Sequence, residues 1–246
     1  MGVDEIPYKF LEMPAAPARG NVTNLVTDAL RIAIVTLDLK PGEVLDKAAI
    51  CERLGVSRFP VSEALARLQS EGLVEILPQR GSVVSLIRIA DVIEFMMIRK
   101  ALESEAVRAL AMCPTTELKA ALEENLKAQK VADKTGDRAT FHARDLQFHD
   151  LLFDAIGLDR VRTVIDSTRA NLDRARRLIL DPRRTTKSLG EHRIILNAIS
   201  AENPVEAASA MRTHIDNVMG ELLVFAETHP GVFADSGEKA QTYAFG

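Results

Sequence analysis

The sequence has few cysteines, no long apolar run and no excess of basic residues. Its two cysteines, Cys51 and Cys113, cannot form a disulfide framework, which favours an intracellular protein. No stretch of about 18 uncharged apolar residues occurs, so no membrane-spanning helix is expected. Lys and Arg number 31 against 35 Asp and Glu, giving a net charge of −4, which argues against coating nucleic acid through bulk charge.

The 246 residues, 47% of them hydrophobic, exclude a disordered chain and predict a cytoplasmic globular protein. Pattern divides the chain into four segments. Residues 1–18 contain three prolines and no helical period, and are expected to form a flexible tail. Residues 19–88 and 89–229 are expected to form two domains, and the Gly-rich, polar residues 230–246 a second loose tail.

Residues 19–88 are the only segment that is not acidic, with a net charge of +1. Helical spacing predicts helices over 21–39, 47–54 and 58–71, the third with Ser57 as its N-cap. Two β-prone runs, 73–77 and 82–86, flank the turn 78–81 and predict a hairpin. Two short helices followed by a hairpin describe a winged helix-turn-helix.

The third of these helices has an apolar face of Val61, Ala64, Leu65 and Leu68, which is expected to pack against the domain. That arrangement leaves Arg58, Ser62 and Arg67 on the outer face, where they could contact nucleic acid. Arg80 and Gly81 stand at the hairpin tip, where a wing touches phosphate or the minor groove. A module that mediates only protein contacts is the alternative.

The run Pro41–Leu45, then Leu54–Leu65, Glu71–Val74 and Arg80-Gly81 resembles the GntR family of bacterial transcription regulators. The resemblance implies a homodimer that binds a pseudo-palindromic double-stranded DNA operator. One position departs from it, because Ser62 stands where the family usually has an Arg that reads guanine. The candidate DNA-binding residues are Ser57, Arg58, Pro60, Ser62, Arg67, Arg80 and Gly81.

Beyond Ala90 the pattern is helical, and the fold class is therefore mainly α: an N-terminal winged helix-turn-helix followed by an all-α bundle of about six helices. The predicted segments are 90–112, 115–135, 138–156, 159–180, 188–200 and 205–228.

Four polar residues fall among apolar ones in this half. Asp145 and His149 are four residues apart, one turn apart on one helix; His192 is placed at the start of another helix and His214 midway along the last. Three imidazoles and a carboxylate that meet inside a bundle would make a ligand set for Zn²⁺, Ni²⁺ or a similar ion. Satisfied core or surface histidines are the competing interpretation.

The region 90–228 resembles the FCD effector domain of the FadR branch of the same family. The resemblance implies a divalent metal, Zn or Ni, held by Asp145, His149, His192 and His214, and a small organic carboxylate as effector. It also gives Arg99, of the Arg99-x3-Glu103 motif, a role in holding that carboxylate.

Asn171 and Arg174 are further candidate effector contacts. The competing interpretation for Arg99 and Glu103 is an exposed ion pair, and for Arg174, Arg176 and Arg177 a solvated basic face. His142 and His229 are expected at the surface.

These features together predict a DNA-binding transcription regulator, in the commoner sense a repressor, and not an enzyme. Two alternatives stay open. One is a metal-free regulator that binds a longer acyl ligand. The other is a metal-dependent hydrolase, which lacks a His-Glu-x-x-His motif and whose nearest base, Glu191, points about 100° away from its neighbour His192 on a helix.

Overall fold

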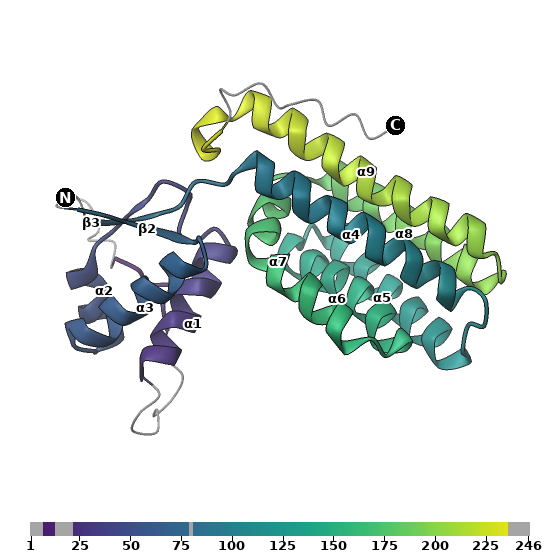
Figure 1. Ribbon diagram of the computed structural model, residues 1–246, viewed down its shortest axis with the longest axis horizontal. Helices are drawn as coiled ribbons and strands as arrows, with labels where there is room; N and C mark the ends of the chain where they lie inside the picture. Colours follow the sequence, from purple (N-terminus) through teal and green to yellow (C-terminus); the bar gives the residue numbers. More distant parts are fainter. Residues whose placement is uncertain (1–6, 13–21, 79–80, 236–246) are drawn as a thin grey trace. The chain divides into compact units, whose positions relative to one another are not determined.

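The computed structural model describes residues 7–12, 22–78 and 81–235 and divides the chain into two compact units. One unit combines the described part of residues 1–88 with residues 229–235, and the other is Ile89–Thr228. The first is a winged helix-turn-helix (Figure 1). Its elements are α1 (Val22–Val35), β1 (Val44–Leu45), α2 (Lys47–Leu54), α3 (Arg58–Ser70), β2 (Val74–Leu77) and β3 (Gly81–Val84).

The sheet has one strand more than the predicted hairpin. Its order is β1-β3-β2, all antiparallel, with Val83 of β3 opposite Val44 on one side and Glu75 on the other. The extra strand β1 has two residues, which is too short to show an alternating pattern in the sequence. It follows that the wing is built on three strands rather than two.

Capping sets the geometry of the helix-turn-helix. Asp46 accepts hydrogen bonds from the N–H groups of Ala48 and Ala49 at the start of α2, and Gly55 ends that helix with a φ of 65°. A left-handed residue at this point turns the chain at no steric cost only if it is glycine. Ser57 occupies the N-cap position of α3 in an extended conformation, although its hydroxyl makes no capping hydrogen bond.

The predicted apolar face of α3 is confirmed. Val61, Ala64, Leu65 and Leu68 are all fully buried. The remaining positions of the helix, with the exception of Pro60, are exposed to solvent. The domain thus presents the face of α3 opposite these residues to solvent.

The predicted N-terminal tail contains an anchored stretch among its described residues. Leu11 is 2% exposed, and the Tyr8 hydroxyl accepts a hydrogen bond from the backbone N–H of Asp46. Arg53 donates to the carbonyl oxygens of Tyr8 and Lys9. A single buried leucine has no periodicity, so the sequence pattern could not show this contact.

The predicted C-terminal tail also contains an ordered stretch. Residues Pro230–Val232 form the 3₁₀ helix η1, and Phe233, only 4% exposed, forms a parallel β-bridge with Ile87. The N–H of Ile87 donates to the carbonyl of Val232, and the N–H of Ala234 donates to the carbonyl of Ile87. The chain therefore returns to the winged-helix unit after the last helix of the second unit.

The second unit is all helical, as predicted, and its described elements are six helices (Figure 1). Helix α4 packs along α9, α5 along α6, and α8 along α9. The bounds are α4 (Ile89–Leu110), α5 (Thr116–Thr135), α6 (Arg138–Ile156), α7 (Asp159–Leu178), α8 (Pro182–Ser200) and α9 (Pro204–Thr228).

Helix α8 begins six residues before the predicted start at residue 188. Asp181 caps it by accepting from the N–H of Arg184, and Pro182 occupies the first turn, where its missing N–H has no intrahelical partner. The Asp-Pro pair therefore starts this helix and does not only end the previous one. Over the described part of the chain, none of the helices combines the length and apolarity required to cross a membrane.

Candidate functional site

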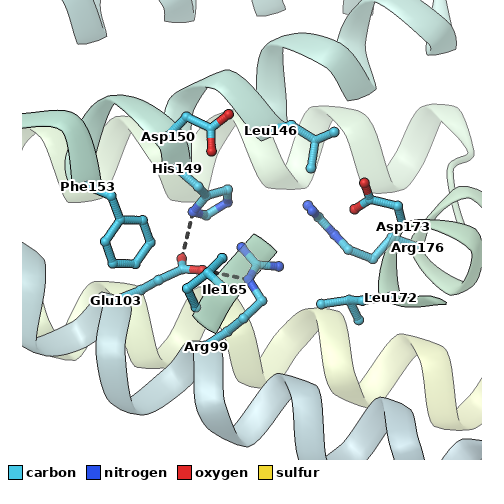
Figure 2. A pocket seen from close by; sticks show the side chains of 10 residues that line it. All are labelled: Arg99, Glu103, Leu146, His149, Asp150, Phe153, Ile165, Leu172, Asp173 and Arg176. Atoms are coloured by element: carbon cyan, nitrogen blue, oxygen red, sulfur yellow. Dashed lines mark hydrogen bonds and ion pairs between the residues drawn. The ribbon is translucent and has the colours of Figure 1, made fainter. Parts of the chain in front are cut away.

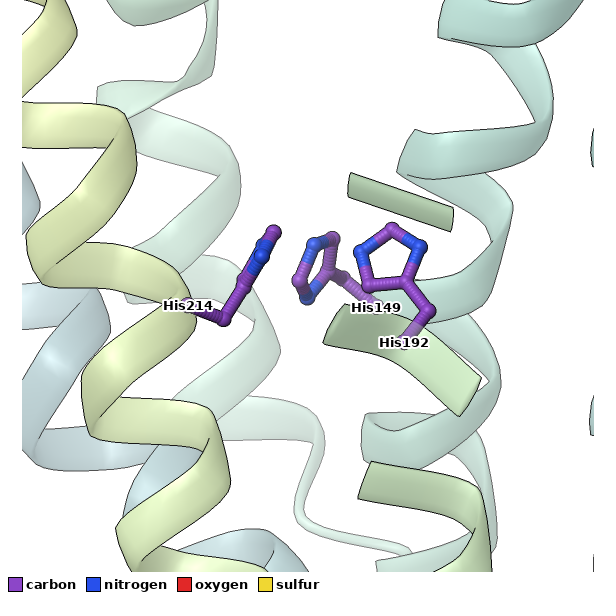
Figure 3. A group of neighbouring side chains, drawn as sticks. All are labelled: His149, His192 and His214. Atoms are coloured by element: carbon purple, nitrogen blue, oxygen red, sulfur yellow. The ribbon is translucent and has the colours of Figure 1, made fainter. Parts of the chain in front are cut away.

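Three histidines from three helices meet inside the helical unit (Figure 3). His149 lies on α6, His192 on α8 and His214 on α9, and they are 4%, 0% and 0% exposed. One ring nitrogen from each lies within 4.8 Å of the others. His192 is in the middle of α8 and not at its start, because the helix begins earlier than predicted.

Each of these histidines contacts a partner through its Nδ1 atom, and each partner offers an oxygen. A carboxylate or amide oxygen only accepts, so the hydrogen bonds of His192 and His214 favour a proton on Nδ1 and a lone pair on Nε2. Nδ1 of His149 lies at ion-pair distance from Glu103 without hydrogen-bond geometry. The partners are Glu103 for His149 at 2.7 Å, Gln129 for His192 at 2.9 Å and Glu191 for His214 at 2.7 Å.

The Gln129 amide is itself held in one orientation. Its Nε2 donates to Oδ1 of Asn125 at 2.7 Å, which leaves its Oε1 for His192. Asn125 in turn donates from Nδ2 to the backbone carbonyl of Arg144 at 3.0 Å. Both amides are buried, so a reversed orientation of Gln129 would place its Oε1 against Oδ1 of Asn125, two acceptors facing each other.

The Nε2 atoms of His149, His192 and His214 are buried and have no hydrogen-bond partner among the described residues. Burial, with repulsion from neighbouring positive groups, holds the pKa values of His192 and His214 well below the ordinary value, so these rings are neutral at pH 7. Neutral imidazole nitrogens are good ligands for Zn²⁺ and Ni²⁺. The three histidines can therefore hold a metal ion.

Asp145 lies beside this cluster. It is 2% exposed, and its Oδ1 is 3.7 Å from Nε2 of His192. Its Oδ2 forms a buried ion pair with Arg176 of α7. Burial alone would raise the pKa of Asp145, but the charge of Arg176 outweighs it and holds that pKa well below its usual range. Of the four predicted metal ligands, His149, His192 and His214 are mutual neighbours. Asp145 lies beside them, and one of its oxygens is paired with Arg176.

A small cavity opens beside His149 (Figure 2). Arg99 lines it and donates from Nε to Oε1 of Glu103 at 2.6 Å. The two side chains are 5% and 1% exposed, so the interpretation as an ion pair on an exposed face is wrong. Burial would raise the pKa of Glu103, yet Arg99 and His149 hold it far below the ordinary value. The other lining residues are Leu146, Asp150, Phe153, Ile165, Leu172, Asp173 and Arg176.

The predicted polar contacts on α7, Asn171 and Arg174, do not line this cavity. Arg174 is fully buried and donates from Nη1 to Oδ1 of Asn171 at 3.2 Å, but neither residue is among those that line the cavity. Arg176 lines it instead. Since Arg174 and Arg176 are both buried, the interpretation of these arginines as a solvated face is wrong.

The prediction that His142 lies at the surface is also wrong. It is 1% exposed, and burial together with the charge of Arg176 lowers its pKa to about 3. Its position on α6, one turn before Asp145, places it on the inward face of the helix. His229 is exposed, as predicted.

The candidate DNA-binding residues divide by exposure. Ser57, Arg58, Ser62 and Gly81 are exposed, whereas Pro60 is buried and can act only through the helix backbone. Arg67 is exposed and donates from Nη1 to Oδ1 of Asn24 in α1 at 2.6 Å. Arg80 lies outside the residues that the structure describes.

A winged helix-turn-helix in one unit and an all-helical second unit define a class of protein, the DNA-binding regulators. Residues 23–84 match the model of the gntR family of bacterial regulatory proteins, and residues 94–217 match the FCD domain. The chain belongs to the GntR family and carries an FCD domain. It is a DNA-binding transcription regulator and not an enzyme.

Relatives are similar over most of their length. The chain is 34% identical to an HTH-type transcriptional regulator in an unstable DNA locus of Streptomyces ambofaciens, covering 83% of this chain and 86% of the relative. It is 32% identical to the HTH-type transcriptional repressor RspR of Escherichia coli, covering 77% and 83%.

Solved structures show the same fold. One is a GntR transcriptional regulator from Rhodococcus, with a TM-score of 0.71 and 24% identity over 82% of this chain and 97% of that one. Another is McbR/YncC of E. coli, with a TM-score of 0.69 and 21% identity over 83% and 98%.

Proposed function

We propose that the helical domain binds a divalent metal ion, Zn²⁺ or Ni²⁺ by the nature of the donors, and senses a small organic carboxylate. The observation that carries this proposal is the set of three buried Nε2 atoms, on His149, His192 and His214, that have no hydrogen-bond partner among the described residues. Buried polar atoms are rarely left unpaired, and a cation satisfies all three at once. Asp145 adjoins them as a fourth candidate ligand.

Two guanidinium groups are the candidate contacts of an anionic effector, in a cavity whose lining also carries the carboxylates of Glu103, Asp150 and Asp173. Arg99 on α4 and Arg176 on α7 line the cavity that His149 also lines (Figure 2). Charge-assisted hydrogen bonds from arginine to a carboxylate are strong and directional. A bound metal ion would add a Lewis-acidic position at the His149 end of the cavity. Asn171 and Arg174 remain candidate contacts for a part of the effector that extends along α7.

The response passes through the helices that carry these groups. Arg99 and Glu103 lie on α4, and His214 lies on α9, which packs along α4. The chain enters the helical unit at α4 and leaves it at α9. An effector that changes the packing of these two helices therefore acts at both connections to the winged-helix unit.

The winged helix-turn-helix indicates how the protein would bind its operator. We infer that a homodimer places two α3 helices on the half-sites of a pseudo-palindromic operator, and that effector binding relieves repression by changing their separation. Arg58, Ser62 and Arg67 are the exposed candidates for base and phosphate contacts, with the wing residues Arg80 and Gly81.

Metal analysis tests the proposal. Purified parent protein should contain one metal ion per chain, and the double variant His149→Ala, His192→Ala should contain none. His229→Ala, which removes an exposed histidine, is the matched control and should keep its metal. Equal metal content in the double variant and the parent would reject the site.

A thermal-shift screen of small carboxylic acids tests the effector. Stabilisation should appear only with metal present, because a ligand raises stability by mass action when it binds the folded state. Stabilisation that survives chelation would favour a metal-free regulator for a longer acyl ligand. Hydrolysis has no support here, because the carboxylate of Glu191 is already bonded to His214, Asn217 and Arg184.

A further inference from the structure

An aromatic side chain stands in the first turn of α3. Phe59 follows Arg58 and is 71% exposed, although it belongs to a helix whose inner face is fully buried. Single exposed apolar residues are common on protein surfaces, so exposure alone assigns nothing. The position of Phe59 is what gives its exposure a meaning.

Helical geometry places Phe59 at the centre of the outward face. Residues are offset by about 100° each, so Phe59 lies about 180° from the fully buried Leu68. Ser62 is about 60° away on the same face, and its short side chain is exposed. The ring therefore projects from the middle of the exposed surface, between the short side chain of Ser62 and the exposed Glu63, which lies about 40° away on the other side.

This face is the part of a helix-turn-helix that meets base edges. The second helix lies in the major groove, and its N-terminal residues make the base contacts. A phenyl ring has no hydrogen-bonding group, so it cannot read the donors and acceptors of the groove. The apolar group presented there is the C5-methyl of thymine, which phenylalanine contacts in protein–DNA interfaces.

We propose that Phe59 is a specificity-determining residue that contacts the methyl group of one thymine in each operator half-site. Arg58, beside it, supplies charge for phosphate or guanine. The pair Phe59 and Ser62 shifts readout at this turn from hydrogen bonding toward apolar contact. The inference rests on the DNA-reading role of α3 and is independent of the metal site.

Methyl deletion in the DNA tests this contact directly. Full-length protein would first select its sites from a randomised duplex library. Each thymine of the selected site is then replaced, one symmetric pair at a time, by deoxyuridine, which lacks the methyl group. Affinities are measured by fluorescence anisotropy at constant salt for the parent and for Phe59→Ala.

In the parent, one symmetric pair should weaken binding by about fourfold per half-site, the effect of losing one buried methyl. In Phe59→Ala the same replacement should have no effect, and Phe59→Leu should retain part of it. Ile32→Ala, which removes a 62% exposed side chain of α1, is the control and should keep the parent's sensitivity.

Equal deoxyuridine sensitivity in the parent and in Phe59→Ala would overturn the role of Phe59, as would a parent insensitive at every thymine. Both results leave operator binding intact. Failure to select any duplex would contradict operator binding itself and this inference with it. Thermal unfolding of each variant, expected to match the parent because Phe59 is exposed, separates a lost contact from a lost fold.

Discussion

The buried pair of Arg99 and Glu103 gives a sharp test of how the site is held together. Removing the carboxylate in Glu103→Ala leaves the guanidinium of Arg99, 5% exposed, without its 2.6 Å partner. It also removes the group 2.7 Å from Nδ1 of His149. Breaking a buried ion pair from one side costs about 3–5 kcal/mol.

That magnitude is large for this unit. At roughly 2 cal/mol/K of unfolding entropy per residue, a unit of about 140 residues loses about 10–17 °C in Tm for 3–5 kcal/mol. The measurement is calorimetry and urea unfolding followed by circular dichroism, with a chelator present so that metal binding contributes nothing.

Two further variants make the reasoning refutable. The double variant Arg99→Met, Glu103→Leu removes both charges and should recover most of the loss, because replacing a buried pair by apolar groups is close to neutral. Glu105→Ala breaks only a solvent-exposed pair with Arg108 and should leave the Tm unchanged. A loss below about 1 kcal/mol for Glu103→Ala, or a double variant as unstable as the single one, would refute the argument.

Three further predictions concern DNA, metal and pH. Arg58→Ala should abolish operator binding in anisotropy assays at physiological salt while the helical unit keeps its circular dichroism. Gln129→Leu should weaken metal binding about 10- to 100-fold in competition with a chromophoric chelator, because it removes the acceptor that orients His192. In metal-free protein, His142 should lower the unfolding free energy by about 1.4 kcal/mol per pH unit as pH falls from about 6 toward 3.

The sign of the pH effect follows from the two states. The folded pKa of His142, about 3, lies below the unfolded value, so the unfolded chain takes up the proton first. Stability is therefore complete above about pH 6.5 and is lost on acidification. The variant His142→Phe should show a shallower dependence of the unfolding free energy on pH, measured by urea titrations, and identical slopes would contradict the assignment.

Gln129→Glu keeps an acceptor and should bind metal more tightly than Gln129→Leu. Equal weakening of metal binding in the two variants would point to packing alone.

The sequence predicted the elements better than their surroundings. The apolar face of α3 and the six helices of the second unit follow from local spacing, and the structure confirms both. The two-residue strand β1 and the early start of α8 were missed, because the first is too short for a period and the second depends on a cap. Local pattern is sufficient where a helix is long and amphipathic.

The candidate site divides in the same way. Residue type and apolar flanks single out the three histidines in the sequence, whereas their partners Gln129 and Glu191 give no local signal. The contact between Gln129 and His192 spans 63 residues of sequence, and that between Glu191 and His214 spans 23. The sequence does not predict the burial of Arg176 either, because a helix rich in polar residues has the pattern of a solvent-exposed one and its packing partners are distant in sequence.

The pairing of Ile87 with Phe233 makes the winged-helix unit discontinuous in sequence. In topological terms the helical unit is an insertion between two sequence segments of the winged-helix unit. A fragment that stops at Arg88 would also lose the strand partner of Ile87 and expose its apolar side chain, so the DNA reader should be expressed with its C-terminal segment included.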